Sequence, residues 1–138
     1  MSESARHMHL VSFIVGWVTK TYPTDDLCIL VDVPNNAAAN KPPSIGGYFP
    51  DVFVKAIGRP LTIIGEAKTT QDLETCRSKS QLVSYLTFLK TVSDPCLVIS
   101  TSWTVQRTAK GLMCHLRQTC DAAHVPLVFV TEMPPITC

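Results

Sequence analysis

The feature that most constrains the fold is a pair of apolar, strand-like runs in the middle of the sequence. Residues 49–57 (FPDVFVKAI) and 61–68 (LTIIGEAK) are rich in the β-branched and aromatic residues that favour strands. Only Gly58, Arg59 and Pro60 separate them. A connection this short joins antiparallel strands, whereas parallel strands need a long crossover. The centre of the chain is therefore predicted to be an antiparallel hairpin.

The remaining segments are assigned from the spacing of their apolar residues, which differs between helices and strands. In chain order they are a helix over 3–19, a strand over 27–33, a loop over 34–48, a helix over roughly 71–92, a strand over 96–101, a helix over 105–123 and a strand over 126–131. The order is α-β-β-β-α-β-α-β in a single domain spanning residues 1–138. Helical crossovers toward the C-terminus imply right-handed connections and partly parallel pairing. We therefore predict the α/β class, with a single mixed central sheet flanked by helices.

The composition excludes several classes of protein. An apolar share of 46% and a charged share of 17% suit a folded globular chain rather than a disordered one. The net charge of +1 provides no overall positive field, so a polyanion would have to be held by a local patch or by bound cations. No apolar stretch approaches the ~20 residues that span a bilayer, and the opening MSESARHMHL has no secretory pattern. We expect a soluble protein of the cytoplasm or nucleus with no membrane partner.

Three polar residues interrupt the predicted hairpin, namely Asp51, Glu66 and Lys68. The hairpin turn brings Asp51 beside Glu66, while Glu66 and Lys68 are two residues apart and project from the same face. Two neighbouring carboxylates repel each other unless a proton or a cation relieves them, and Mg²⁺ or Mn²⁺ prefers such oxygen ligands. The pattern predicts a divalent-metal site. The alternative is that Asp51 shapes the strand entry and that Glu66 and Lys68 form an exposed charge pair.

The same residues carry a resemblance to a known family. PD at 50–51 followed by GEAK at 65–68 resembles the paired motif of the PD-(D/E)xK superfamily, the restriction-endonuclease-like nucleases. Members share an α-β-β-β-α-β core with the motifs on the second and third strands, which matches the predicted order. Gln81 and Tyr85 form a Q-x-x-x-Y pattern similar to the extra motif of RecB-type nucleases. The resemblance covers roughly residues 3–101 and implies a restriction-endonuclease-like fold.

The resemblance also implies roles for individual residues. Asp51, Glu66 and the main-chain carbonyl of Ala67 would hold one or two Mg²⁺ or Mn²⁺ ions. Lys68 would position the attacking water, and Gln81 would orient Lys68 or a phosphate. The implied activity is metal-dependent hydrolysis of phosphodiester bonds in nucleic acid, with DNA favoured over RNA.

Other residues extend this predicted site. Glu3 is the preferred auxiliary metal ligand and His7 the second choice, because both lie on the helix stripe expected to face the sheet. The Q-x-x-x-Y pair would contact substrate, although Tyr85 would ordinarily be a core residue. Arg77 and Lys79 are the basic residues best placed to meet phosphates.

A different class of function stays open. A non-catalytic module of the same fold would bind nucleic acid or a protein partner, because one fold supports many functions. The presence of Asp51, Glu66 and Lys68 together favours the enzyme, since a domain that had lost catalysis would typically lack one of them. A chain this small often needs a second copy or a larger protein partner to hold a duplex, and both remain open.

Overall fold

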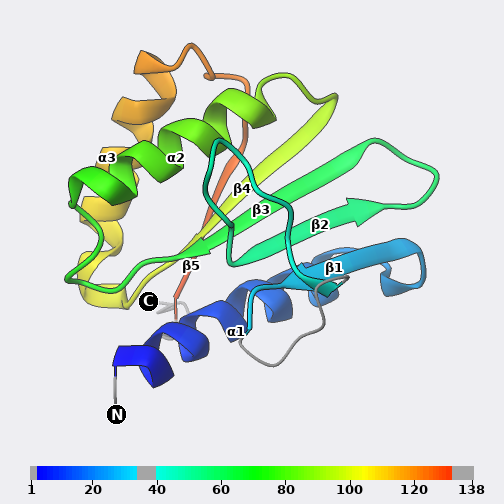
Figure 1. Ribbon diagram of the computed structural model, residues 1–138, viewed down its shortest axis with the longest axis horizontal. Helices are drawn as coiled ribbons and strands as arrows, with labels where there is room; N and C mark the ends of the chain where they lie inside the picture. The colour runs from blue at the N-terminus through cyan, green and yellow to red at the C-terminus, as the bar shows by residue number, and fades with distance from the viewer. Residues whose placement is uncertain (1–2, 34–39, 132–138) are drawn as a thin grey trace, which may run out of the picture.

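The computed structural model describes residues 3–33 and 40–131, which form an α/β fold around one five-stranded mixed sheet (Figure 1). The elements in chain order are α1 (Glu3–Thr21), a 3-10 turn η1 (Thr24–Asp26), β1 (Leu27–Val31), β2 (Val52–Ala56), β3 (Leu61–Ala67), α2 (Cys76–Leu89), β4 (Asp94–Ser100), a 3-10 turn η3 (Trp103–Val105), α3 (Gln106–Thr119) and β5 (Leu127–Val130). This order confirms the predicted α-β-β-β-α-β-α-β arrangement. Within the described residues, no helix combines the length and apolar character needed to cross a membrane.

The sheet has the strand order β1-β2-β3-β4-β5, and its pairing changes from antiparallel to parallel at β3. Strands β1, β2 and β3 pair antiparallel, with Val52 opposite Gly65 in the predicted hairpin. Gly58 forms the hairpin turn at a φ of 85°, a left-handed conformation that only glycine adopts easily. Strands β3, β4 and β5 pair parallel, as the crossovers predicted. The carboxyl end of β3 and the amino end of β2 therefore meet at one edge of the sheet.

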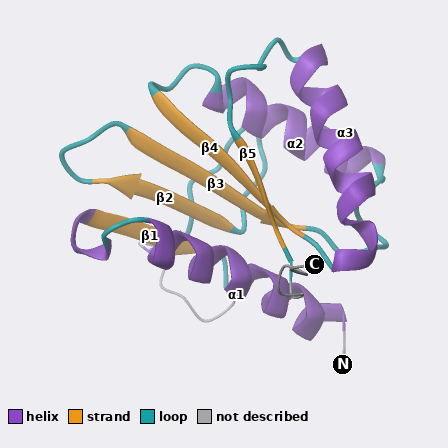
Figure 2. Ribbon diagram, turned by 180° about the vertical axis from the view of Figure 1, so that it is seen from behind, coloured by secondary structure: helices purple, strands orange, loops and turns teal. Residues whose placement is uncertain are grey.

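The helices form a layer on each face of the sheet. Helix α1 covers one face, and α2 and α3 cover the other (Figures 1 and 2). Two separate apolar cores fill these layers, one beneath α1 and one beneath α2 and α3. Helix α1 lies so close to β3 that a Cβ atom at Gly65 would be 2.5 Å from Cγ2 of Ile14. The glycine allows α1 to approach the end of the hairpin where the polar residues lie.

Several element boundaries differ from the prediction at this edge. The predicted second strand begins at Val52 rather than at Phe49, because Pro50 has no N–H to donate and the N–H of Asp51 binds a side chain. Asp51 therefore precedes β2, and Lys68 immediately follows β3.

Helix α2 begins at Cys76 instead of near residue 71. The Thr75 hydroxyl accepts from the N–H of Ser78 and caps the helix, while residues 69–75 form turns. Residues 34–39 of the predicted 34–48 loop lie outside the described part of the chain.

Candidate functional site

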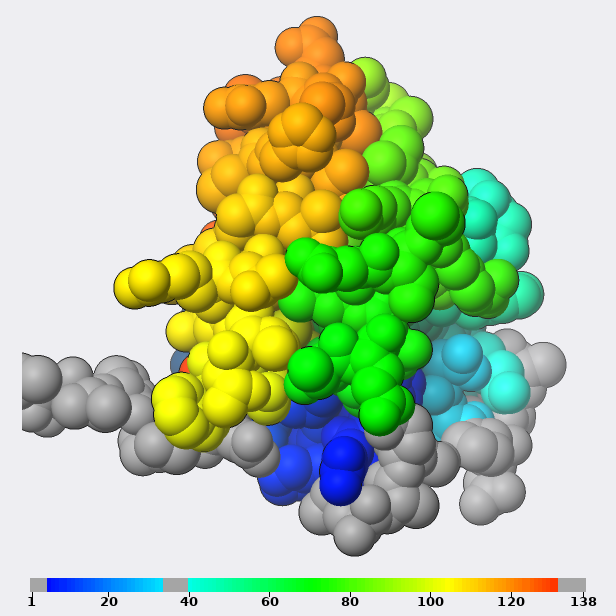
Figure 3. Space-filling model, turned by 90° about the vertical axis from the view of Figure 1, so that its left-hand side faces the viewer, coloured from blue at the N-terminus to red at the C-terminus, as the bar shows by residue number. Residues whose placement is uncertain are grey.

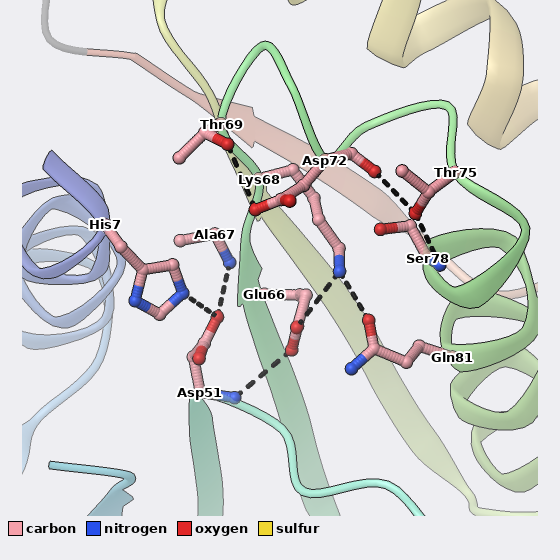
Figure 4. A network of polar contacts seen from close by, with 10 residues as sticks. All are labelled: His7, Asp51, Glu66, Ala67, Lys68, Thr69, Asp72, Thr75, Ser78 and Gln81. Carbon is pink, nitrogen blue, oxygen red and sulfur yellow. Dashed lines mark hydrogen bonds and ion pairs between the residues drawn. The ribbon is translucent and has the colours of Figure 1, made fainter. Parts of the chain in front are cut away.

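The candidate site lies where the amino end of β2 and the carboxyl end of β3 face the N-terminal parts of α1 and α2 (Figure 4). Figure 3 shows this end of the molecule, where the green surface of the residues leading into α2 lies above the blue surface of α1. A cavity of about 350 Å³ is lined by His7, Asp32, Phe49, Asp51, Glu66, Ala67, Lys68, Asp72, Thr75, Arg77, Ser78 and Gln81. The structure thus brings together all four residues predicted to be catalytic.

Two hydrogen bonds from backbone N–H groups hold the carboxyl groups of Asp51 and Glu66 beside each other. The N–H of Asp51 donates to Oε2 of Glu66 at 3.2 Å, and the N–H of Ala67 donates to Oδ2 of Asp51 at 2.8 Å. Both carboxyl groups belong to buried residues, with 7% of Asp51 and 3% of Glu66 exposed. The N–H and C=O of an extended residue point to the same side, so the carbonyl of Ala67 also faces Asp51. Two carboxylates and one carbonyl therefore converge at the cavity.

Lys68 is held between two side chains. Its Nζ donates to Oε1 of Gln81 at 2.5 Å and lies 3.5 Å from Oε1 of Glu66. Only 5% of Lys68 is exposed. This burial rules out the alternative in which Glu66 and Lys68 form an exposed surface pair.

His7, the second choice for an auxiliary metal ligand, reaches the cavity from α1. Its Nε2 lies 3.1 Å from Oδ2 of Asp51. This hydrogen bond raises the pKa of His7 above its usual value, although partial burial of the imidazole opposes the shift. Glu3, the preferred auxiliary ligand in the sequence prediction, begins α1, but its side chain lies outside the described residues.

The cavity is rich in carboxyl groups. Four carboxyl groups line it, whereas Lys68 and Arg77 are the permanent cations among its lining residues. Burial raises the pKa of Glu66 to about 8, and the negative charge of Asp51 adds to that shift. A divalent cation would relieve both effects, and the oxygen donors suit Mg²⁺ or Mn²⁺.

The donor set is nevertheless small. In the described ranges, no group of three or more His, Cys, Asp or Glu side chains is arranged to hold a metal ion. An ion at this site would depend on Asp51, Glu66 and the main-chain oxygen of Ala67, which is the set that the resemblance implied. Its remaining positions would be open to water or substrate.

Tyr85 lies in the core rather than in the cavity. Its side chain is fully buried, and its hydroxyl has no hydrogen-bond partner in the part of the chain that the structure describes. Burial raises the pKa of the phenol, and the negative charges of Glu66 and Asp51 and the approach of the hydroxyl to the Glu66 side chain raise it further. Tyr85 is not among the residues that line the cavity, so its predicted contact with substrate has no direct geometric support.

The two basic residues predicted to meet phosphates differ in position. Arg77 lines the cavity, and its Cζ lies 5.4 Å from the centre of the Tyr48 ring. Lys79 is exposed on α2 and is not among the lining residues.

Sequence reasoning missed Thr75 and Ser78, which line the cavity at the start of α2. A threonine followed three residues later by a serine whose N–H it accepts is an N-cap pattern. The threonine at position 75 could have indicated this cap from the sequence. It was overlooked because the helix was predicted to begin near residue 71.

Similarity to known proteins does not assign a function to this cavity. Comparison with protein-family models, curated proteins and solved structures finds no match. The function must therefore be inferred from the arrangement of the cavity residues themselves.

Proposed function

We propose that this protein is a metal-dependent nuclease of the restriction-endonuclease-like type. The observation that carries the proposal is the buried, hydrogen-bonded pair of Asp51 and Glu66, with the Lys68 ammonium 3.5 Å from Glu66. Such a pair costs stability unless a cation or a proton compensates it. The substrate would be nucleic acid, with DNA favoured over RNA, in the cytoplasm or nucleus.

Each cavity residue would have a distinct role in phosphodiester hydrolysis. Asp51, Glu66 and the carbonyl of Ala67 would hold Mg²⁺ or Mn²⁺, which when bound lowers the pKa of a ligated water and offsets charge on the phosphate. Lys68 would donate a hydrogen bond to the attacking water or to a phosphate oxygen, which fixes its position. A water oxygen bonds to phosphorus as one P–O ester bond breaks, which yields a phosphate monoester and a free hydroxyl.

Two other side chains would support these groups. The His7 imidazole donates to Oδ2 of Asp51, which leaves Oδ1 without a hydrogen bond from the described residues and free to bind a cation. Gln81 accepts from Lys68 and holds the ammonium at the cavity.

A nuclease assay tests the proposal. The purified protein is incubated with Mg²⁺ or Mn²⁺ and with linear, circular, branched and single-stranded DNA and RNA. We expect cleavage by the parent chain and by Asp25→Asn, a control at an exposed acidic residue on η1, and none by Asp51→Asn. Absence of cleavage on every substrate, or equal cleavage by Asp51→Asn, would refute the enzyme.

A non-catalytic module with the same fold is the second candidate. It is favoured by the small set of metal-ligating side chains among the described residues. A melting experiment separates the two, because an ion that binds only the folded protein raises Tm. A Tm that does not change at millimolar Mg²⁺ or Mn²⁺, together with binding of nucleic acid or of a protein partner, would favour the module. The same experiment at several protein concentrations tests for a homodimer or larger assembly.

A further inference from the structure

We propose that the α2 wall of the cavity, formed by Arg77, Ser78 and Gln81, is a phosphate subsite. This inference rests on the proposed function and specifies what the wall binds, namely an oxyanion of a phosphate group in the nucleic-acid strand. Three independent features of the wall support it.

The first feature is the hydroxyl of Ser78. Only 3% of Ser78 is exposed, yet the residue lines the cavity. Its N–H is capped by Oγ1 of Thr75 at 3.1 Å, whereas its hydroxyl has no hydrogen-bond partner among residues 3–33 and 40–131. Figure 4 shows this hydroxyl turned away from α2 toward the side where Lys68 lies. The hydroxyl is not one of the enclosed unpaired atoms of the described residues, so it is open to the cavity and can donate to a ligand oxygen there.

The second feature is the free amide nitrogen of Gln81. A lysine ammonium can only donate, so the oxygen of the Gln81 amide must be the atom that binds Lys68. The nitrogen then carries two N–H groups that no described residue accepts, and Figure 4 shows it on the side facing Asp51 and Glu66. Gln81 and Ser78 are three residues apart and share one face of the helix. Their free donors therefore line the same wall.

The third feature is the position of Arg77. Its guanidinium lies over the ring of Tyr48 and forms no ion pair with any described carboxylate, although four carboxyl groups line the same cavity. Stacking of this kind holds the plane of the guanidinium while leaving its N–H groups free for a planar or tetrahedral oxyanion. The N-terminus of α2 adds a partial positive charge beside it.

The free groups of Arg77 and Gln81 can only donate, and the Ser78 hydroxyl can donate as well as accept, so the wall fits an anion better than a cation. The carboxyl groups of Asp51 and Glu66 come from the sheet side of the cavity, opposite α2 (Figure 4). A phosphate in the cavity would meet donors on one side and, on the other, acids that require a cation. The subsite should therefore bind phosphate well only when a divalent cation is present.

Binding without turnover tests the subsite. We would measure fluorescence anisotropy of a 3′-labelled single-stranded oligodeoxynucleotide in Ca²⁺ over a range of salt concentrations. Arg77→Met should weaken binding about tenfold and reduce the slope of log K against log salt by about 0.7, the value for one phosphate contact on a single strand. Arg77→Lys should keep the parent slope, because it keeps the charge. Ser78→Ala should weaken binding about three- to tenfold with no change in slope, because it removes a neutral donor.

Lys20→Met is the matched control, since it removes an exposed cation from the last turn of α1, at the other end of that helix from His7. It should bind with the parent affinity and slope. The same oligonucleotide with a 5′-phosphate or a 5′-hydroxyl identifies the source of the phosphate. Tighter binding of the 5′-phosphate form that Ser78→Ala abolishes assigns a terminal phosphate, and equal loss with both forms assigns an internal one.

The subsite is refuted if Arg77→Met and Ser78→Ala bind like the parent, or if the parent does not bind in Ca²⁺. This result is separate from the nuclease assay, which tests cleavage through Asp51→Asn. A protein that binds through Arg77 and Ser78 but does not cleave would keep the subsite and lose the enzyme. Circular dichroism melting of each variant verifies that it is folded.

Discussion

The ammonium of Lys68 donates to the side-chain oxygen of Gln81 at 2.5 Å from Nζ to Oε1. Lys68 follows β3 directly, whereas Gln81 lies in the second turn of α2, so this bond ties the helix to the end of the central hairpin. Both residues are buried, with 5% and 9% exposed respectively. The position of the ammonium beside Glu66 therefore depends on α2 as well as on the sheet.

Removal of the Gln81 side chain should reduce turnover and also cost stability. Gln81→Ala leaves a buried ammonium with one partner fewer, so we expect unfolding to become easier by about 1–3 kcal/mol. Turnover should fall roughly ten- to a hundredfold, the scale of a lost supporting contact. Thermal melts and steady-state cleavage at saturating Mg²⁺ measure the two effects.

An exposed glutamine at this helix position would cost almost no stability when replaced. Gln81 is buried instead, with 9% exposed, which is why we expect the larger cost. Ser80→Ala, at the exposed neighbouring position, is the matched control and should leave both quantities unchanged. Full activity in Gln81→Ala would reduce the Q-x-x-x-Y match to coincidence.

Substitutions of Lys68 and of Asp51 should have different effects on cleavage and on metal binding. Lys68→Ala should abolish cleavage while Mg²⁺ still raises Tm, because the lysine is not a metal ligand. Asp51→Ala should lose both cleavage and the Mg²⁺-dependent rise in Tm, because its carboxylate would bind the ion. Cleavage assays and melts with and without Mg²⁺ measure these outcomes. Cleavage at the parent rate by both variants would show that the catalytic assignment is wrong.

The hairpin and the order of elements could be predicted because each depends on local sequence. The short turn at Gly58 and the apolar runs on either side of it determine which strands pair and in which direction. The adjacency of Asp51 and Glu66 followed from that pairing alone.

Features that depend on packing between distant segments could not be predicted in the same way. The contact of His7 with Asp51 requires α1 to approach β3 closely, which the missing side chain of Gly65 allows. The start of α2 depends on the Thr75 cap, and local propensity could not distinguish it from a start five residues earlier. The position of Ser78 at the cavity depends on this helix start, so the sequence did not indicate it.

Tyr85 should tolerate loss of its hydroxyl. The hydroxyl is buried and has no hydrogen-bond partner in the described part of the chain, so Tyr85→Phe removes an unsatisfied polar group. We expect a Tm equal to or above that of the parent and a smaller loss of turnover than in Gln81→Ala. Melting curves and cleavage rates measured side by side verify this.

Tyr85→Ala provides the contrast, because it should cost about 3–5 kcal/mol by leaving a cavity in the core. A marked fall in Tm for Tyr85→Phe would instead show that the hydroxyl holds a group such as Glu66 in solution. The core role of the ring and the role of the hydroxyl are thereby separated.

The stability of the metal-free protein should fall as pH rises. Burial and the charge of Asp51 raise the pKa of Glu66 from 4.5 in its usual state to about 8 in the folded chain. Between these values the folded state binds more protons than the unfolded state, so the free energy of unfolding decreases with increasing pH. His7 contributes in the same direction, because its pKa is also raised on folding and its contribution is lost as pH rises through the folded value. Melts in a chelating buffer from about pH 4.5 to about pH 8 measure this loss.

Two comparisons assign the effect to the carboxyl pair. Glu66→Gln replaces the titrating group by a neutral one of similar shape, so its Tm should depend less on pH, whereas Glu74→Gln, at an exposed glutamate before α2, should follow the parent. Mg²⁺ favours ionised Glu66, so saturating Mg²⁺ should reduce the loss of stability at the alkaline end. A difference in Tm between the parent and Glu66→Gln that does not change with pH in the absence of metal would contradict the close burial of Asp51 and Glu66. The buried carboxyl pair would then fail as the basis for a metal site, whatever the outcome of the cleavage assay.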